Sequence, residues 1–235
     1  MDTQDPGEEV NSAASSRGRF ITFEGGEGAG KSVQARELAH RLKSLGVNVV
    51  STREPGGSPN AEALRQVILS GEAARYGPSG EALLFSAARI DHIDVTIEPA
   101  LTRGDWVVCD RFADSTRAYQ GAAGQLDPEF IARLEEIVLD RTRPDLTLIL
   151  DLPAERGLER AAKRRSGQGA PDRFEGEGLA FHETLRNAFL RIAREEPERC
   201  AVIDATLSED EVAETIWDVV SRRLADFLPS EAKAK

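Results

Sequence analysis

Short apolar runs recur along the chain, and each is too short for a helix and rich in β-branched or aromatic residues. They cover residues 20–23, 47–51, 106–109, 146–150 and 201–203. Runs of this kind are typical of strands that are buried on both faces of a parallel sheet. The pattern therefore predicts the strands of one parallel sheet.

Between these runs, apolar residues recur three and four positions apart, which is the period of an amphipathic helix. The clearest sets are Ala35, Leu38, Ala39 and Leu42; then Leu185, Ala188, Phe189 and Ile192; then Val212, Ile216 and Val219. Ser208 followed by Glu211 is a capping box that predicts the start of the last helix. Strands that alternate with helices favour a sheet covered by helices on both faces, within one domain.

The two ends of the chain differ from this pattern. Residues 1–18 are acidic and rich in Ser, Ala and Gly, so we expect a disordered tail. Residues 229–235 are expected to form a second frayed end. The predicted domain covers residues 19–228.

Composition and charge exclude several classes of protein. The 235 residues are 40% hydrophobic and 30% charged, as in globular proteins, and no apolar run approaches the ~20 residues of a membrane span. An apolar N-terminal signal is lacking, which predicts cytoplasmic residence without a membrane partner. Cys109 and Cys200 lack metal-ligand spacing and are interpreted as buried thiols. The net charge of −11 argues against a nucleic-acid partner, although clustered arginines could still make a local cationic cleft.

The segment 25–32 fits the phosphate-binding pattern G-x-x-x-x-G-K-[ST], directly after a predicted strand and before a predicted helix. Its residues are Gly25, Gly26, Glu27, Gly28, Ala29, Gly30, Lys31 and Ser32. Glycines allow successive N–H groups to face one anion, and the helix N-terminus adds positive charge. Lys31 is expected to hold the β- and γ-phosphates of ATP, and the Ser32 hydroxyl to hold Mg²⁺.

Arginines follow the predicted strands, at the edge where α/β sheets bind ligands. Arg53 follows the second strand, Arg111 follows the third, and Arg89 lies on the helix between them. A basic segment at 163–165 leads into a Gly-rich loop that ends at Asp172-Arg173. This arrangement suits two phosphate-bearing substrates beneath a closing lid. A monophosphate acceptor is already an anionic nucleophile and requires no strong general base. The three histidines are therefore interpreted as structural.

Several segments together resemble the thymidylate kinase family across nearly all of residues 19–225. They are FEGGEGAGKS (23–32), TREPGG (52–57), LLFSAAR (83–89), VVCDRFADSTRAYQG (107–121), the strand at 145–151 and DRFE (172–175). The resemblance implies a three-layer α/β/α fold of the P-loop NTPase type, with a five-stranded parallel sheet in the order 2-3-1-4-5 and a lid at about 163–175. It also implies phosphoryl transfer from ATP to dTMP with Mg²⁺, by a homodimer.

The resemblance further implies roles for residues that would bind the acceptor base. Phe85 would stack on thymine and Arg89 would hydrogen-bond its edge, while Ser115 and Thr116 would read the pyrimidine. Tyr119 would press on the sugar and disfavour a ribose hydroxyl. Ordinary helix packing remains the alternative for Phe85 and Tyr119.

Other implied roles concern the phosphates and the sugar. Arg53 and Arg111 would grip the acceptor phosphate, and Asp110 would help to hold Arg111 and the waters around magnesium. A local ion pair is the alternative for Asp110 and Arg111. Glu27 would contact the sugar 3′-hydroxyl.

The phosphate loop lacks an arginine, whereas the lid is basic, as in the bacterial subtype of the family. Arg173, and next Arg165, would supply charge to the transition state. Glu175 would help to order the closed lid, and Arg160 or Arg164 would pack on adenine.

Three alternative functions remain open at this point. The nearest is a kinase of another monophosphate, such as UMP, CMP or AMP. A nucleoside kinase would need a carboxylate base and fewer phosphate-binding arginines, so Arg53 together with Arg111 argues against it. A regulatory module without catalysis would not need Lys31, Ser32 and the lid arginines together.

Overall fold

The computed structural model describes residues 17–165, 174 and 176–229, apart from the side chain of Arg165. In this part of the chain, five strands form one parallel sheet in the order β2-β3-β1-β4-β5. They are β1 (Phe20–Gly25), β2 (Val49–Arg53), β3 (Trp106–Asp110), β4 (Leu146–Asp151) and β5 (Cys200–Asp204). The predicted fold class and strand order are confirmed.

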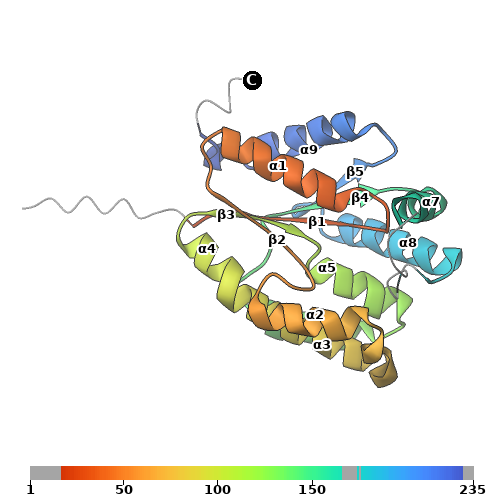
Figure 1. Ribbon diagram of the computed structural model, residues 1–235. Helices are drawn as coiled ribbons and strands as arrows, with labels where there is room; N and C mark the ends of the chain where they lie inside the picture. The colour runs from red at the N-terminus through yellow and green to blue at the C-terminus, as the bar shows by residue number, and fades with distance from the viewer. Residues whose placement is uncertain (1–16, 166–173, 175, 230–235) are drawn as a thin grey trace, which may run out of the picture.

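Helices cover both faces of the sheet, as Figure 1 shows. The helices are α1 (Lys31–Ser44), α2 (Pro59–Leu69), α3 (Gly77–His92), α4 (Glu98–Thr102), α5 (Ala113–Thr116), α6 (Pro128–Leu139), α7 (Ala154–Arg165), α8 (Leu179–Glu195) and α9 (Glu209–Arg223). In the described chain, two further segments are 3₁₀-helices, η1 (Glu72–Tyr76) and η4 (Ala225–Phe227), and two are π-helical, η2 (Ile93–Ile97) and η3 (Arg117–Ala123).

The buried side chains divide between the two faces because alternate residues of a strand point to opposite sides. On one face, Phe23 of β1 and Leu148 of β4 pack with α1 and α9. On the other face, Phe20 and Val107 pack with η2, α4 and α6, while Ile149 packs with α8. The two faces together make a three-layer α/β/α sandwich.

Most of the predicted elements lie where the pattern places them, and the capping box of Ser208 and Glu211 is present at the start of α9. The second strand begins at Val49, two residues later than expected. Val47 donates its N–H to Leu42 O (3.1 Å) across a turn in which Gly46 has φ 82°, so residues 47–48 belong to the connection from α1.

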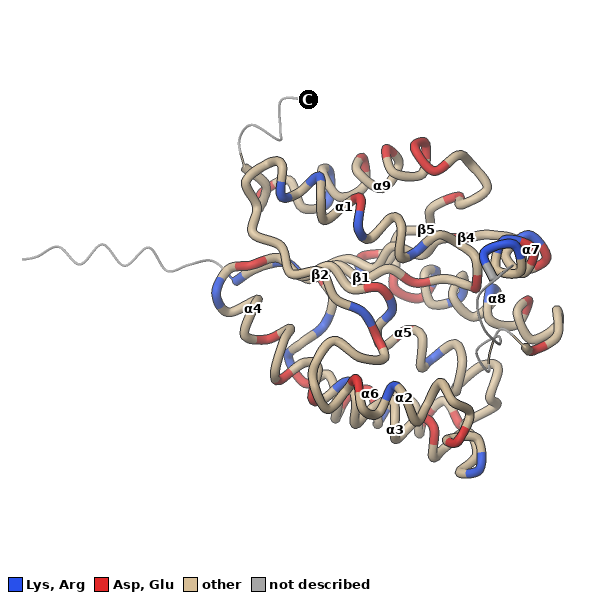
Figure 2. The backbone as a smooth tube through the Cα atoms, viewed as in Figure 1, with Lys and Arg blue, Asp and Glu red and all other residues tan. Residues whose placement is uncertain are grey.

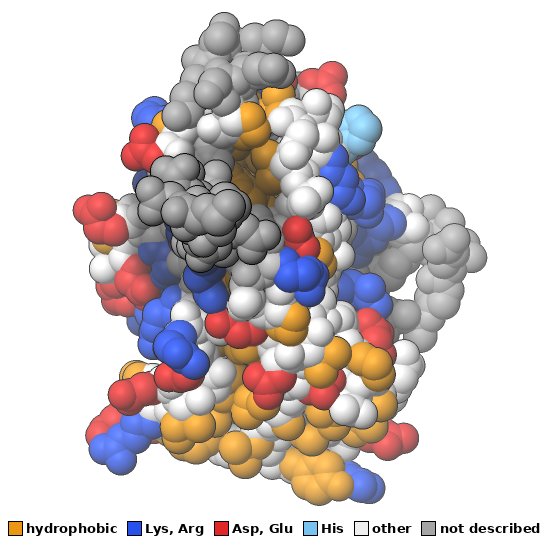
Figure 3. Space-filling view, turned by 90° about the vertical axis from the view of Figure 1, so that its left-hand side faces the viewer, with side chains coloured by type: hydrophobic (Ala, Val, Ile, Leu, Met, Phe, Trp, Pro, Cys, Tyr) orange, Lys and Arg blue, Asp and Glu red, His pale blue; other side chains and the backbone are white. Residues whose placement is uncertain are grey.

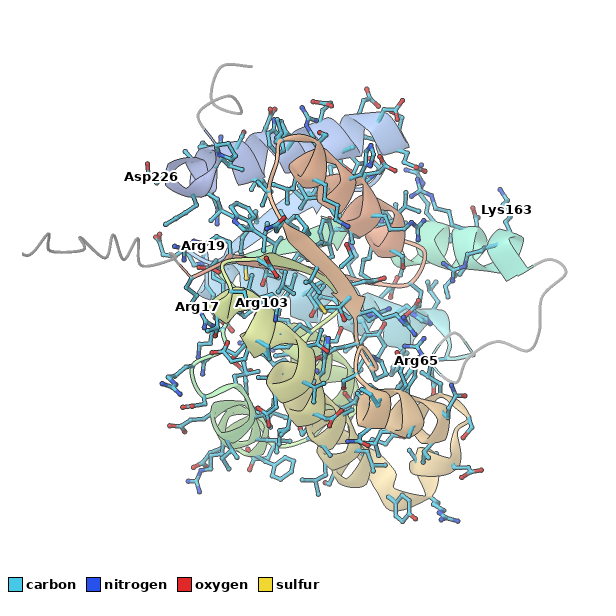
Figure 4. All side chains as sticks on the ribbon, turned by 60° about the vertical axis from the view of Figure 1, so that its left-hand side comes forward. Arg17, Arg19, Arg65, Arg103, Lys163 and Asp226 are labelled. Atoms are coloured by element: carbon cyan, nitrogen blue, oxygen red, sulfur yellow. The ribbon has the colours of Figure 1, made fainter. Side chains whose placement is uncertain are left out.

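At the N-terminal end, the described chain begins inside the segment that we expected to be a tail. Arg17 donates two hydrogen bonds of 2.8 Å to the Glu98 carboxylate, and the N–H of Gly18 bonds Leu101 O. Arg17 and Arg19 lie at the amino edge of the sheet, far from Lys163 of α7 (Figure 4). The rest of the expected tail, and most of the C-terminal one, lie outside the described residues. No described helix is long and apolar enough to cross a bilayer.

Candidate active site

The predicted phosphate loop leaves β1 and enters α1 without a side-chain cap. Gly30 precedes α1 with φ 94°, and no side-chain hydrogen bond caps it. The first-turn amides and the helix dipole therefore face outward, as a site for an anion requires. Gly28, with φ 68°, lies so close to α7 that an added Cβ would be 2.1 Å from Gly157 O. The loop is thus shaped by contact with α7 as well as by its own sequence.

Lys31 is buried in this loop, with only 6% of its surface exposed. Its Nζ donates to Gly26 O at 2.6 Å. Burial and the charge of Arg111 lower the pKa of Lys31, and Glu27 and Asp110 raise it in part, so that the pKa is about 8. A phosphate that reached this amine would therefore meet a cation with little competing water.

Ser32 and Asp110 meet where α1 begins and β3 ends. The Ser32 hydroxyl donates to one carboxylate oxygen of Asp110. The other oxygen, Asp110 Oδ1, is buried and has no hydrogen-bond partner among the described residues. A hydroxyl beside a carboxylate is a donor set for Mg²⁺, which prefers oxygen ligands. No described group of three or more His, Cys, Asp or Glu residues could hold a metal. Such an ion would therefore take most of its ligands from phosphate and water.

Arg111, Glu27 and Tyr119 form a compact charged group beside the phosphate loop. Glu27 Oε1 accepts hydrogen bonds from Arg111 Nη2 at 2.5 Å and from the Tyr119 hydroxyl at 2.7 Å. Burial raises the pKa of Glu27, but Arg111 and Lys31 outweigh it and bring the value to about 2. Burial also raises the pKa of Tyr119 well above its usual value. Glu27 is therefore a carboxylate and Tyr119 a neutral hydroxyl at pH 7.

Glu24 anchors the segment that follows β3, and sequence reasoning missed it. Its side chain is fully buried and accepts from Phe112 N (2.8 Å), Ser115 N (3.1 Å) and the Ser115 hydroxyl (2.7 Å). Burial and the charge of Asp114 raise the pKa of Glu24 to about 7. A Glu just before a glycine-rich loop is a weak signal, because its partners lie about 90 residues away.

The predicted base-binding residues lie on α3 and beside it. The ring of Phe174 lies between those of Phe85 and Tyr119, with its centroid 6.5 Å from the Phe85 ring and 5.1 Å from the Tyr119 ring. Arg89 lies one turn further along α3 and is buried. Its guanidinium donates to Glu54 Oε2 (2.7 Å), Thr116 Oγ1 (3.1 Å) and Phe112 O (3.1 Å).

These groups surround a cleft of about 350 Å³ at the carboxyl ends of β1, β2 and β3. From the predicted set, its wall contains Glu27, Gly28, Gly30, Lys31, Ser32, Arg53, Phe85, Asp110, Arg111, Ser115, Thr116 and Tyr119. Of the other predicted residues that the structure describes, Gly25, Gly26, Ala29 and Arg89 are not part of this wall. Further wall residues were not predicted for it: Val33, Glu54, Pro55, Arg65, Leu69, Gln120 and Phe174.

Arg65 is the one cation among these seven further wall residues of the described chain. It extends from α2, where Figure 4 labels it, and donates to Pro55 O at 2.6 Å. The apolar pattern of the sequence could not have predicted that Arg65 lines the cleft, because arginines on helices usually face solvent. Its position follows from the fold alone.

Part of the predicted lid can be placed. Arg164 of α7 reaches the cleft wall, and most charges on α7 are basic (Figure 2). Arg160 instead donates to Ala205 O at 3.2 Å. The lid residues Arg173 and Glu175, and the side chain of Arg165, lie outside the described residues. His92 and His182 are both buried and do not contribute to the cleft wall of the described chain.

Comparisons with known proteins agree on one family. Residues 23–216 match the sequence model of the family described as Thymidylate kinase. A protein of Bradyrhizobium diazoefficiens named Thymidylate kinase is 55% identical over 93% of this chain and 94% of its own. A protein of Afipia carboxidovorans with the same name is 56% identical over 93% and 95%. The crystal structure of thymidylate kinase from Ehrlichia chaffeensis aligns with a TM-score of 0.70 and 33% identity, over 87% of this chain and 99% of that one.

Proposed function

The chain belongs to the thymidylate kinase family and transfers the γ-phosphoryl group of ATP to dTMP, and we propose that the cleft residues do this in the roles set out here. One observation carries the proposal. Lys31 and Ser32 of the phosphate loop share a wall with Arg53 and Arg111 at the ends of the neighbouring strands. A donor and an acceptor phosphate would therefore meet between cations that come from both sides.

For the donor, we propose that the start of α1 and Lys31 hold the phosphates of ATP. Lys31 would exchange its bond to Gly26 O for phosphate oxygens, which keeps its charge compensated. The transferred group spreads negative charge over its oxygens, so a fixed cation and aligned amides lower the barrier without a general base. Arg164 lies in the wall of the cleft and would contact the adenine side of ATP.

Magnesium fits the Ser32 and Asp110 pair, and we propose that these two residues hold it. The observation that supports this is Asp110 Oδ1, which is buried and lacks a partner in the described chain. When bound, Mg²⁺ would neutralise charge on the ATP phosphates. The Ser32 hydroxyl and the Asp110 carboxylate would orient it, directly or through water.

For the acceptor, we propose that dTMP lies between α3 and the Glu27–Arg111–Tyr119 group. Phe85 would stack on thymine, and Thr116 with the buried Arg89 behind it would face the edge of the base. Ser115 was also expected to contact the pyrimidine, but its hydroxyl already donates its hydrogen to Glu24 and could only accept a hydrogen bond from the base.

We propose that Arg53 and Arg111 bind the acceptor phosphate from opposite sides. The Arg111 guanidinium already pairs with Glu27, so the pair would present a fixed N–H edge to the phosphate and a carboxylate to the sugar 3′-hydroxyl. Tyr119 lies next to that carboxylate and would close the space at the sugar C2′.

A coupled assay across dTMP, UMP, CMP and AMP tests the acceptor assignment. We expect the highest kcat/KM with dTMP. CMP and AMP would present a different base edge to Thr116 and Arg89, whereas UMP has the same edge but carries the 2′-hydroxyl that Tyr119 would exclude. A rate with UMP or AMP equal to that with dTMP would contradict the acceptor assignment.

Lys31→Ala tests the donor site. This variant should retain the fold and lose at least ~10²-fold in kcat, in line with the removal of one transition-state charge contact.

We propose that two copies of the chain associate through α3 and α6. These helices pack together and expose large apolar side chains: Leu83 (53%), Ile90 (42%), Phe130 (37%) and Ile137 (75%), with Val95 (53%) beside them. Hydrophobic side chains gather on the lower part of the face in Figure 3. A group of exposed apolar side chains of this kind is typical of an interface. Cytoplasmic residence stays a prediction.

A further inference from the structure

Arg53, the last residue of β2, depends on one neighbour. Its side chain is 52% exposed, and within the described chain its only partner is the carboxylate of Glu62 on α2. Arg53 Nη2 lies 2.9 Å and 3.2 Å from the two oxygens of Glu62. The Nε and Nη1 hydrogens make no bond to any described residue. They are the donors that a phosphate in the cleft could use.

The Glu62 carboxylate is itself held by backbone. Its Oε1 accepts from Gly57 N at 3.0 Å, and its own N–H bonds Ser58 O at 2.9 Å in the first turn of α2. The preceding Gly56 has φ 126°, and a Cβ there would lie 2.5 Å from Glu62 Oε1. Gly56 therefore makes room for this carboxylate, and Gly57 donates its N–H to it. Its position does not depend on Arg53.

The start of α2 is tied in turn to α3. Asp91 of α3 accepts from the Ser58 hydroxyl (2.5 Å), Asn60 Nδ2 (2.8 Å) and Ala61 N (3.2 Å). Because α3 also carries Phe85, the carboxylate of Glu62 is placed relative to the helix that faces the base. The contacts run from the base side of the cleft to its phosphate side.

We infer that Glu62 is a positioning residue that holds the Arg53 guanidinium in the orientation that binds the acceptor phosphate of dTMP. The inference rests on the proposed function, in which Arg53 contacts that phosphate. Glu62 itself lies outside the cleft wall and acts only through Arg53. It uses hydrogens of one guanidinium nitrogen and leaves the others to the ligand.

The alternative is that Glu62 competes with the phosphate for Arg53. Two observations argue against competition. Glu62 accepts from Gly57 N as well as from Arg53, so the backbone holds its carboxylate beside the guanidinium and it need not leave for phosphate to bind the other nitrogens. While Arg53 is paired, its Nε and Nη1 make no bond to any described residue. An exposed arginine that is held in one orientation loses less conformational freedom when a ligand binds, which increases affinity.

Calorimetric titration with dTMP and with thymidine tests this inference. Glu62→Gln keeps the size of the side chain and an oxygen for Gly57 N, but it removes the charge that pairs with Arg53. We expect the Kd for dTMP to rise by roughly tenfold as the orientation is lost. We expect the Kd for thymidine to stay the same, because thymidine has no phosphate. In turnover, KM for dTMP should rise while kcat and KM for ATP stay within twofold.

Two further variants separate the possible outcomes. Arg53→Ala alone tests the proposed function, since unchanged dTMP affinity in that variant would remove Arg53 from phosphate binding. If Glu62 acts through Arg53, the double variant Glu62→Gln/Arg53→Ala should bind dTMP no more weakly than Arg53→Ala. A clear loss with Arg53→Ala but none with Glu62→Gln, or tighter dTMP binding by Glu62→Gln, would overturn the inference alone.

A matched control comes from another exposed pair. Arg41 and Glu214 join α1 to α9 at 2.7 Å, away from the cleft wall. Glu214→Gln removes the same type of contact and should leave dTMP binding unchanged. Glu62→Ala provides a second variant with the same expected loss. Glu62→Gln should keep the wild-type melting temperature, because exposed ion pairs contribute little to stability. Glu62→Ala also removes the acceptor of Gly57 N and should melt at a slightly lower temperature.

Discussion

At the scale of single residues, Arg111 has an uncommon backbone conformation that its neighbours maintain. Its φ is 69°, a region that residues other than glycine rarely adopt. Its N–H bonds Phe23 O at 2.9 Å, and the next segment is held by Glu24 through Phe112 and Ser115. These contacts aim the Arg111 side chain at Glu27. The arginine that we propose to bind the acceptor phosphate is thus positioned by the buried carboxylate of Glu24.

The same carboxylate gives a prediction for stability against pH. Burial and Asp114 raise the pKa of Glu24 to about 7, above the 4.5 of an unperturbed carboxyl. Between these two values the folded chain holds a proton that the unfolded chain has released, so this group's contribution to stability falls as pH rises. Glu24→Gln mimics the protonated form. Its melting temperature relative to wild type should therefore increase from pH 5 to pH 8, as measured by calorimetry in one buffer series.

A difference in melting temperature that stayed constant over this range would contradict a raised pKa of Glu24. Glu27 is the internal comparison, because its pKa is lowered to about 2 and its contribution to stability is lost only as pH falls below about 4.5. The two carboxylates therefore act on opposite sides of pH 4.5. The difference in melting temperature between Glu24→Gln and wild type isolates the contribution of Glu24.

Tyr119 gives a second prediction at this scale, because its ring and its hydroxyl can be separated. The ring contacts Phe174 and Phe181 edge-on, and the hydroxyl donates to Glu27. Tyr119→Phe keeps the wall and should keep the preference for dTMP over UMP, with a several-fold loss in kcat/KM. Tyr119→Ala should relax that preference and cost about 3–4 kcal/mol of stability as a buried aromatic is lost. If Tyr119→Ala discriminates as wild type does, the residue is structural.

At the scale of elements, the contact between the phosphate loop and α7 is made without side chains. An added Cβ at Gly157 would lie 2.3 Å from Glu27 O, and one at Gly28 would meet Gly157 O. The two glycines allow a loop and a helix to touch through their backbones. Since the loop must present its amides at fixed positions, this contact controls the donor site.

Gly157→Ala tests this contact. Alanine improves helix propensity by about 1 kcal/mol, but the Cβ would displace the carbonyl of Glu27. We expect KM for ATP to rise at least ~10-fold in steady-state assays, with no loss of helix by circular dichroism. Gly178→Ala is the control, because a Cβ there meets nothing within 4 Å. Wild-type kinetics in Gly157→Ala would mean that the loop tolerates the shift.

The elements also show how far sequence reasoning reaches. Apolar runs located all five strands of the described chain because buried parallel strands have few other compositions. The motif at 25–32 located the loop because local geometry dictates its glycines. Glu24 and Glu62 were missed because each works by accepting hydrogen bonds that only the folded chain brings to it. Arg89 was placed on the right helix, but its burial behind Thr116 depends on the packing of α3.

At the scale of the whole molecule, charge is distributed unevenly. The chain carries a net charge of −11, yet the cleft wall brings together Lys31, Arg53, Arg65, Arg111 and Arg164. Glu27, Glu54 and Asp110 lie in the same wall, so its described charged residues are five cations and three anions. A local positive cleft on an acidic body attracts anionic nucleotides without a general affinity for nucleic acid. Raising ionic strength should therefore weaken nucleotide binding more than it changes the melting temperature.

Association of two chains is the last prediction, and it follows from the face of α3 and α6. Leu83 and Ile137 expose 53% and 75% of their surface, and contact with a second copy would remove that area from water. Sedimentation of wild type should give twice the 25.6 kDa chain mass, and Leu83→Glu with Ile137→Glu should give one chain mass. Val202→Glu is the control, since Val202 is 47% exposed on the edge strand β5. The double variant should dissociate because unpaired glutamates buried in an apolar contact cost free energy. A double variant that stays dimeric would place the interface elsewhere, and a monomeric wild type would mean that this face is not a dimer interface.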